Sequence, residues 1–121
     1  MRWAILILLL TGCSSMPEPL EVRVVVVEGC PGRDATVERI KAIAEDLDVA
    51  IALRSVLVTT PGGAVEAHLL GSPTVLINGL DIELSARKRS DFAIACRVYG
   101  GTPVPPKAMI EAALRDAHED R

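Results

Sequence analysis

Apolar and polar positions follow one another along the chain with periods that predict a short series of strands and helices. Residues 22–27 form a β-branched run with one early charge, which is typical of a buried strand. From about residue 33 the period changes, and five apolar positions share one face of a predicted helix: Val37, Ile40, Ile43, Ala44 and Leu47. Residues 49–58 predict a second strand that is buried on at least part of both faces.

The second half of the chain is punctuated by turn residues. The predicted elements there are a helix at 64–70, a third strand at 74–77, a fourth strand at 80–84, a loop with a helical stretch at 85–99 and a final helix at 107–118. Gly71 ends the first of these, and Asn78-Gly79 is the strongest two-residue hairpin signal. The hairpin makes the third and fourth strands antiparallel.

The resulting element order, β-α-β-α-β-β-α, predicts a single α/β domain. A right-handed crossover makes the first two strands parallel. With the hairpin added, this gives a small mixed sheet of four strands with helices on both faces.

The N-terminus has the parts of a secretory signal peptide: a basic start at Arg2, an apolar run at 4–10 and small residues before Cys13. Leu10-Thr11-Gly12-Cys13 also resembles the bacterial lipobox, in which the cysteine is lipidated and becomes the first residue. We therefore expect a signal peptide at 1–12, a lipid-anchored tether at 13–19 and one domain at 20–121. The alternative is an ordinary signal, or a buried N-terminal strand in which Cys13 is incidental.

Lipidation of Cys13 predicts a protein of the cell envelope, held to a membrane by acyl chains such as palmitate and facing the periplasm or another extracytoplasmic space. Ser14 follows the cysteine, and resemblance to sorted lipoproteins then favours the outer membrane in a Gram-negative cell. Disulfides form and persist outside the cytoplasm. Two further thiols, Cys30 and Cys96, are available for such chemistry.

Composition excludes several classes of function. The net charge is -3 and no basic run is present, which argues against a nucleic-acid partner. After the signal, Phe92 and Tyr99 are the only aromatic residues, too few for a stacking platform. His68 and His118 are interpreted as surface helix residues, and no Cys and His spacing suggests structural zinc. We expect a monomer without a cofactor.

Cys30 is the first candidate for chemistry because it follows the first strand and precedes the first helix. Unpaired backbone N–H groups and the helix dipole stabilise an anion there, which favours a thiolate nucleophile. Arg33 adds a positive charge one turn along, and Pro31 suits the first helical position. The alternative is a small buried apolar cysteine.

Cys96 lies 66 residues further along (96 − 30), so only topology brings the two thiols together. The fourth strand ends at the edge where Cys30 lies, which places Cys96 within reach of a disulfide. The alternative is a core cysteine on a helix with Phe92 and Ala93. Arg97, next to Cys96, is a candidate to hold an anion or stabilise a thiolate.

The acidic residues near the hairpin, and the Arg97 and Tyr99 pair, have a simpler interpretation. Asp81 and Glu83 alternate along the fourth strand, so both point the same way and predict a solvated face. Arg97 and Tyr99 have the same spacing and are interpreted as a similar surface pair.

The order of elements and two local motifs resemble the thioredoxin-like fold family. Cys30-Pro31 stands between strand and helix, and Ser72-Pro73 opens the third strand. More narrowly, the segments GCP, GSPTVLINGLDIE and CRVY look like a group of bacterial thioredoxin-like proteins. The resemblance implies that Pro73 is cis and packs beside Cys30, and that the backbone at Ser72 pairs with an extended peptide substrate. In this chain Arg33 replaces the usual second cysteine, so the usual local disulfide cannot form.

These observations favour a membrane-tethered thiol–disulfide redox protein in which Cys30 reacts and Cys96 resolves. Pro31, Ser72, Pro73 and Arg97 are the candidate substrate contacts, and an exported protein with a thiol or disulfide is the expected partner. One alternative is a soft-metal protein that binds Cu, Zn or Hg through Cys30 and Cys96. Another is a non-catalytic interaction module stapled by a disulfide.

Overall fold

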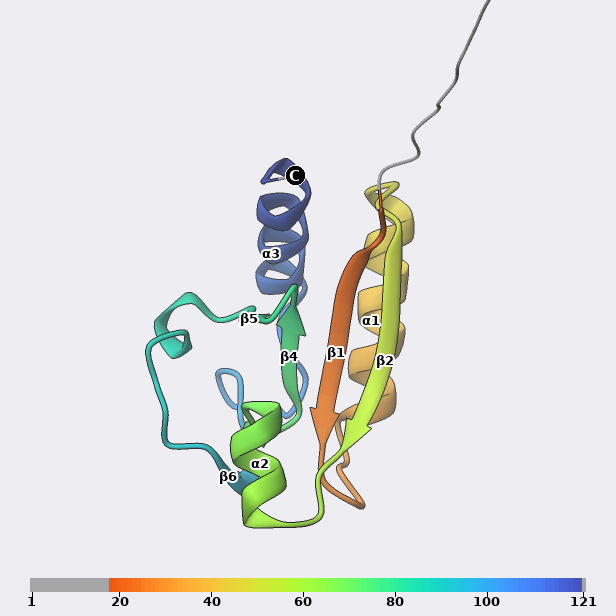
Figure 1. The fold of residues 1–121 in the computed structure, drawn as a ribbon. Helices are drawn as coiled ribbons and strands as arrows, with labels where there is room; N and C mark the ends of the chain where they lie inside the picture. Colours follow the sequence, from red (N-terminus) through yellow and green to blue (C-terminus); the bar gives the residue numbers. More distant parts are fainter. Residues whose placement is uncertain (1–17, 121) are drawn as a thin grey trace, which may run out of the picture.

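The structure, a computed structural model, describes residues 18–120 and contains a four-stranded mixed sheet and three α-helices (Figure 1). Its strands are β1 (Leu20–Val26), β2 (Ile51–Leu57), β3 (Leu70–Ser72), β4 (Thr74–Ile77), β5 (Leu80–Asp81) and β6 (Ala93–Cys96). Its helices are α1 (Arg33–Asp46), α2 (Pro61–Ala67), the 3-10 turn η1 (Leu84–Ala86) and α3 (Lys107–Glu119). The predicted signal at 1–12, lipidation at Cys13 and most of the predicted tether at 13–19 lie outside the described residues.

The main sheet has the strand order β2-β1-β4-β5. β1 pairs parallel with β2 and antiparallel with β4, and β4 pairs antiparallel with β5. This agrees with the predicted α/β class and with the predicted mixed sheet. The Asn78-Gly79 hairpin is confirmed, and both residues have the positive φ that its tight turn requires.

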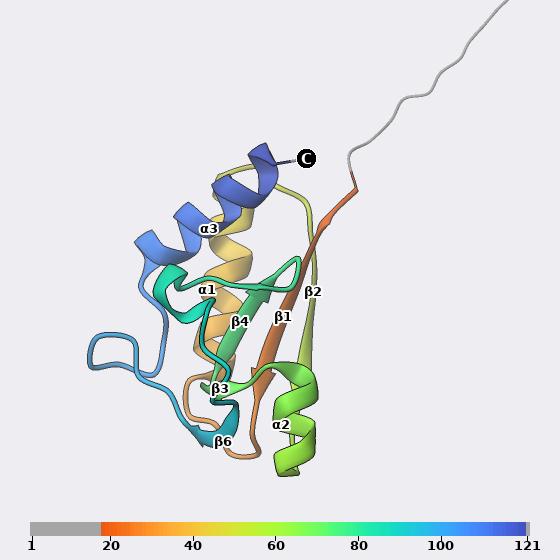
Figure 2. The same cartoon turned by 60° about the vertical axis from the view of Figure 1, so that its left-hand side comes forward.

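Helices cover both faces of this sheet, as Figure 2 shows with α1 and α3 on one side and α2 on the other. Alternate residues of β1 supply the two cores. Val22, Val24 and Val26 pack with α1 and α3, whereas Val25 packs with Ala64 of α2 on the opposite face. The predicted inner positions of the first helix are confirmed for Ile40, Ile43 and Ala44, which are buried; Val37 and Leu47 are partly buried.

Two sequence predictions about elements are wrong, and a third is confirmed. β2 is the edge strand of the sheet, but it is partly buried on both faces as predicted, because Ile51 and Leu53 pack against the α1 and α3 core and Val56 packs against the α2 core. The fourth strand is shorter than predicted, since β5 ends at Asp81 and η1 follows. The segment 85–99 contains no α-helix; its ordered part is β6, which pairs parallel with β3 to form a second, two-stranded sheet.

Both free cysteines of the described chain lie toward the same end of the molecule. Cys30 is in the loop that follows β1, and β6 ends at Cys96 (lower part of Figure 1). Cys96 reaches this end on β6, which pairs with β3, and not by way of the longer fourth strand that the sequence predicted.

Candidate functional site

Cys30 lies in a tight turn between β1 and α1. Its backbone N–H donates to the Val27 carbonyl at 3.3 Å, and its own carbonyl accepts from the Arg33 N–H at 3.4 Å. The side chain is half-buried and packs against the α1 and α3 core. Gly32 is the N-cap and α1 begins at Arg33. Pro31 therefore lies in the turn before the helix and is not its first residue. A turn tolerates the fixed φ and the missing N–H of proline as well as the first helical position does.

Ser72 and Pro73 lie directly beside this turn. The Ser72 Oγ accepts a hydrogen bond from the Val27 N–H at 3.0 Å, which ties β3 to the end of β1. The Ser72–Pro73 peptide bond is cis, and the Pro73 carbonyl accepts from the Tyr99 hydroxyl at 2.7 Å. Ser72 and Pro73 are both buried.

Cys96 reaches the site through the pairing of β6 with β3. Ser72 and Cys96 are register partners, and the N–H of Arg97 donates to the Ser72 carbonyl at 3.0 Å. Ser72 thus contacts the Cys30 turn through its side chain and the Cys96 strand through its backbone. Cys96 is exposed and on a strand, so the interpretation as a core cysteine on a helix is wrong.

Arg97 is enclosed in the interior by two carboxylates. Its Nη1 donates to Asp81 Oδ2 at 2.9 Å, and its Nη2 donates to Asp81 Oδ1 at 3.0 Å and to Glu83 Oε1 at 2.8 Å. Burial opposes the charge, but the hydrogen bonds to Asp81 and Glu83 and the attraction of nearby negative charge together outweigh it and raise the pKa of Arg97. Asp81 is 5% exposed, so the predicted solvated face is wrong for this residue. The guanidinium holds β6 in place and has no free face toward a substrate.

Tyr99 is a site residue that the sequence interpretation placed on the surface. It is 3% exposed, and the centroid of its ring lies 4.7 Å from the Arg97 Cζ. Its hydroxyl donates a hydrogen bond to the Pro73 carbonyl. Burial raises the pKa of Tyr99 above its ordinary value of 10.0, although Arg97 acts in the opposite direction. No local signal identifies Asp81 or Tyr99, because only the folding of β6 against β3 brings them to Arg97 and Pro73.

We expect Tyr99 to keep its proton until the domain unfolds in alkali. The folded chain holds this proton more tightly than the unfolded chain, so the stability that Tyr99 confers is complete below its ordinary pKa and is lost as the pH rises above it. Tyr99 is the only tyrosine in the chain, so phenolate absorbance recorded with circular dichroism follows it alone. Phenolate absorbance should appear together with loss of structure, and Tyr99→Phe should abolish that signal. Ionisation near pH 10 with an intact spectrum would contradict the buried environment.

The segment after Tyr99 closes over the start of α1. A Cβ added to Gly32 would lie 2.6 Å from the Pro103 carbonyl oxygen, so only glycine fits there. Arg39 of α1 donates from Nη1 to the Pro105 carbonyl at 2.9 Å. Residues 103–105 therefore pack against the first turns of α1, next to the Cys30 turn.

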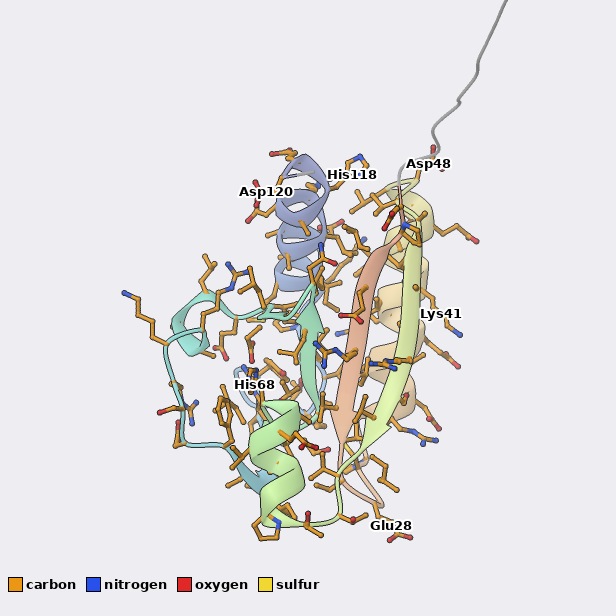
Figure 3. The ribbon with its side chains drawn as sticks, in the orientation of Figure 1. Glu28, Lys41, Asp48, His68, His118 and Asp120 are labelled. Carbon is orange, nitrogen blue, oxygen red and sulfur yellow. The ribbon has the colours of Figure 1, made fainter. Side chains whose placement is uncertain are left out.

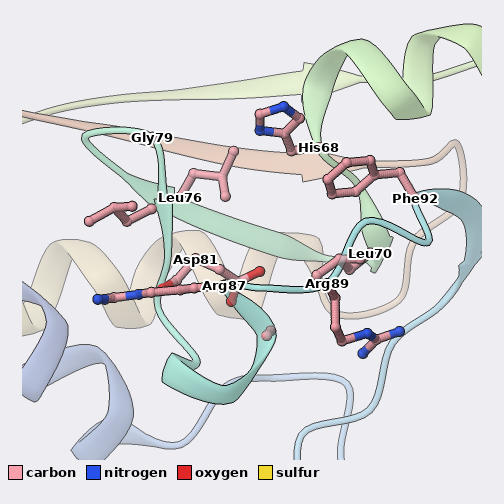
Figure 4. A pocket seen from close by; sticks show the side chains of 10 residues that line it. His68, Leu70, Leu76, Gly79, Asp81, Arg87, Arg89 and Phe92 are labelled. Atoms are coloured by element: carbon pink, nitrogen blue, oxygen red, sulfur yellow. The ribbon is translucent and has the colours of Figure 1, made fainter.

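A separate pocket lies between the end of α2 and the hairpin (Figure 4). His68 stacks on Phe92 with ring centroids 4.8 Å apart. Arg87 and Arg89 line the same pocket but point away from each other, and Arg87 Nε donates to the Asp81 carbonyl at 2.7 Å. Neither cysteine lines this pocket, so it is distinct from the thiol site.

Between residues 18 and 120, no helix has both the length and the apolar character needed to cross a membrane. Within the same range, no three His, Cys, Asp or Glu side chains gather in a way that could hold a metal ion. Comparison of the chain with family models, curated proteins and solved structures found no match.

Proposed function

We propose that this chain is a thiol–disulfide exchange protein with a thioredoxin-like fold, in which Cys30 is the attacking thiol and Cys96 the resolving thiol. The observation that carries the proposal is the position of Ser72. The Ser72 hydroxyl accepts a hydrogen bond from the Val27 N–H, next to the Cys30 turn, and the Ser72 backbone pairs with the strand that ends at Cys96. Two free thiols on either side of one buried residue suit sequential disulfide chemistry.

The reaction balances with the sulfur atoms alone. The Cys30 thiolate attacks a substrate disulfide, forms a mixed disulfide and releases one substrate thiolate, which takes up a proton. The Cys96 thiolate then attacks the Cys30 sulfur, forms the Cys30–Cys96 disulfide and releases the second substrate thiol. The protein dithiol is oxidised and the substrate disulfide is reduced by two electrons, so no cofactor is required.

The setting we propose is the cell envelope, with the chain tethered to a membrane through lipidated Cys13. The apolar run at 4–10 and the Leu10 to Cys13 segment support this part of the proposal. An extracytoplasmic location is also where an exchange pair encounters disulfides that persist.

A redox titration tests the proposal. The full chain with Cys13→Ser, which removes the third thiol, is equilibrated in graded redox buffers in detergent, alkylated and weighed by mass spectrometry. We expect reversible pairing of Cys30 with Cys96 at a potential between about -120 and -270 mV, the range of known exchange proteins. A bridge that forms only below about -300 mV would indicate a structural staple. Two thiols that never pair would contradict the resolving role of Cys96.

A further inference from the structure

The backbone around Pro73 is already occupied by this chain's own residues. The Ser72 carbonyl accepts from the Arg97 N–H, and the Pro73 carbonyl accepts from the Tyr99 hydroxyl. A polypeptide that binds as an added strand needs free N–H and C=O groups on a strand edge. On this side of Cys30, β6 takes the place that such a polypeptide would occupy.

Steric contacts close the same side. A Cβ on Gly71, which has a φ of +108°, would lie 2.9 Å from the Arg97 Cβ, and a Cβ on Gly32 would meet the Pro103 oxygen. β6 and the segment after it thus approach β3 and the start of α1 too closely for any side chain larger than hydrogen. An extended polypeptide has to displace β6 before it reaches Cys30 from here.

The open side of Cys30 is a hollow of about 280 Å³ between its loop and the end of β2. Its lining residues are Val26, Val27, Glu28, Gly29, Cys30, Pro31, Arg33, Asp34 and Leu57. Figure 3 shows Glu28 at this end of the molecule. The volume lies just below the range of drug-sized ligand pockets, which begins at about 300 Å³, and so suits a small ligand.

Charged residues of both signs line this hollow together with Cys30: Glu28, Arg33 and Asp34. Arg33 donates from Nε to Asp34 Oδ1 at 3.0 Å, and within residues 18–120 its two terminal nitrogens make no hydrogen bond. Those nitrogens suit a carboxylate, which arginine binds through paired N–H groups. The Glu28 carboxylate is exposed on the same rim and suits an ammonium group.

We infer that Cys30 exchanges with a small zwitterionic disulfide derived from an amino acid, and not with an extended polypeptide. This inference rests on the proposed function and names its substrate class. Cys30 attacks one sulfur of the small disulfide and displaces an amino-acid thiol. Cys96 then displaces the second thiol and leaves the Cys30–Cys96 disulfide.

The test compares two probes on the full chain with Cys13→Ser: cystine, and the disulfide of an extended peptide that contains a single cysteine. Initial rates of thiol loss are followed by quenched alkylation and mass spectrometry. We expect cystine to react faster. Arg33→Gln should lower the cystine rate about tenfold, the equivalent of about 1.4 kcal/mol and of one hydrogen bond to a charged group. Lys41→Gln, the same charge change on α1 away from the hollow (Figure 3), should leave it unchanged.

A second pair of variants tests the role of β6. Gly71→Ala forces Arg97 away from β3 and should raise the rate with the peptide disulfide, whereas Gly79→Ala also has positive φ but open space around it and should not. If Gly71→Ala fails to fold, the comparison of Arg33→Gln with Lys41→Gln still tests whether the small disulfide binds in the hollow beside Arg33. Peptide and cystine rates that are equal, with no effect of Arg33→Gln, overturn the inference but not the proposed function. No exchange with either probe overturns the proposed function itself.

Discussion

Replacing Arg97 with methionine is expected to lower the free energy of unfolding by about 3–5 kcal/mol, because it leaves a buried carboxylate without its partner. The side chains of Arg97 and Asp81 are each 5% exposed and share two hydrogen bonds. The same guanidinium donates to Thr74 Oγ1 at 3.1 Å. A domain of this size has only about 5–15 kcal/mol of stability, so the loss is a large fraction of the total. Denaturant unfolding of the variant against the parent measures it.

The matched control is Arg89→Met. Arg89 also makes two hydrogen bonds to one carboxylate, Asp91, at 2.9 and 2.7 Å, but both side chains are about half exposed or more. Exposed ion pairs contribute little, so this variant should unfold almost like the parent. Adding Asp81→Leu to Arg97→Met should recover much of the lost stability, because no uncompensated charge then remains buried in the pair. Equal losses of unfolding free energy for Arg97→Met and Arg89→Met would contradict a stabilising role of the buried Arg97–Asp81 ion pair.

Replacing Cys30 with serine is expected to abolish disulfide exchange, since a hydroxyl cannot take the place of the thiolate nucleophile. Cys30 is half-buried in a turn held by two backbone hydrogen bonds, so serine should leave the fold intact. The measurement is the rate at which the variant reduces a disulfide, with circular dichroism as the check on folding. Exchange at the parent rate by a folded Cys30→Ser variant would contradict the role of Cys30.

Cys96→Ser separates the two steps of the same reaction. The first attack by Cys30 should proceed, but the mixed disulfide should persist because its resolving thiol is absent. Mass spectrometry should then detect one substrate adduct on Cys30 per chain. If the adduct is released as quickly as from the parent, Cys96 does not resolve it.

The strands and helices follow from sequence where the signal is local. The β-branched run at 22–27 gave β1 to within two residues, and the spacing of Ile40, Ile43 and Ala44 gave the buried face of α1. Asn78-Gly79 gave the hairpin because the tight turn itself requires a positive φ at both positions. The apolar residues of β2 predict its partial burial on both faces, whereas its place at the sheet edge depends on the other strands.

The sequence alone determined the α/β class, the order of the main elements and the place of Cys30 between the first strand and the first helix, since each rests on local periodicity and on the handedness of crossovers. Only the tertiary structure decided that Asp81 and Arg97 are buried together, that the buried Tyr99 donates to the Pro73 carbonyl, and that β6 pairs with β3. The sequence predicts that a charged residue on a short strand is solvated, because the oppositely charged residue that pairs with it in the interior is not evident from the local pattern. That partner is 16 residues away here, and one strand pairing with a register shift brings the two together.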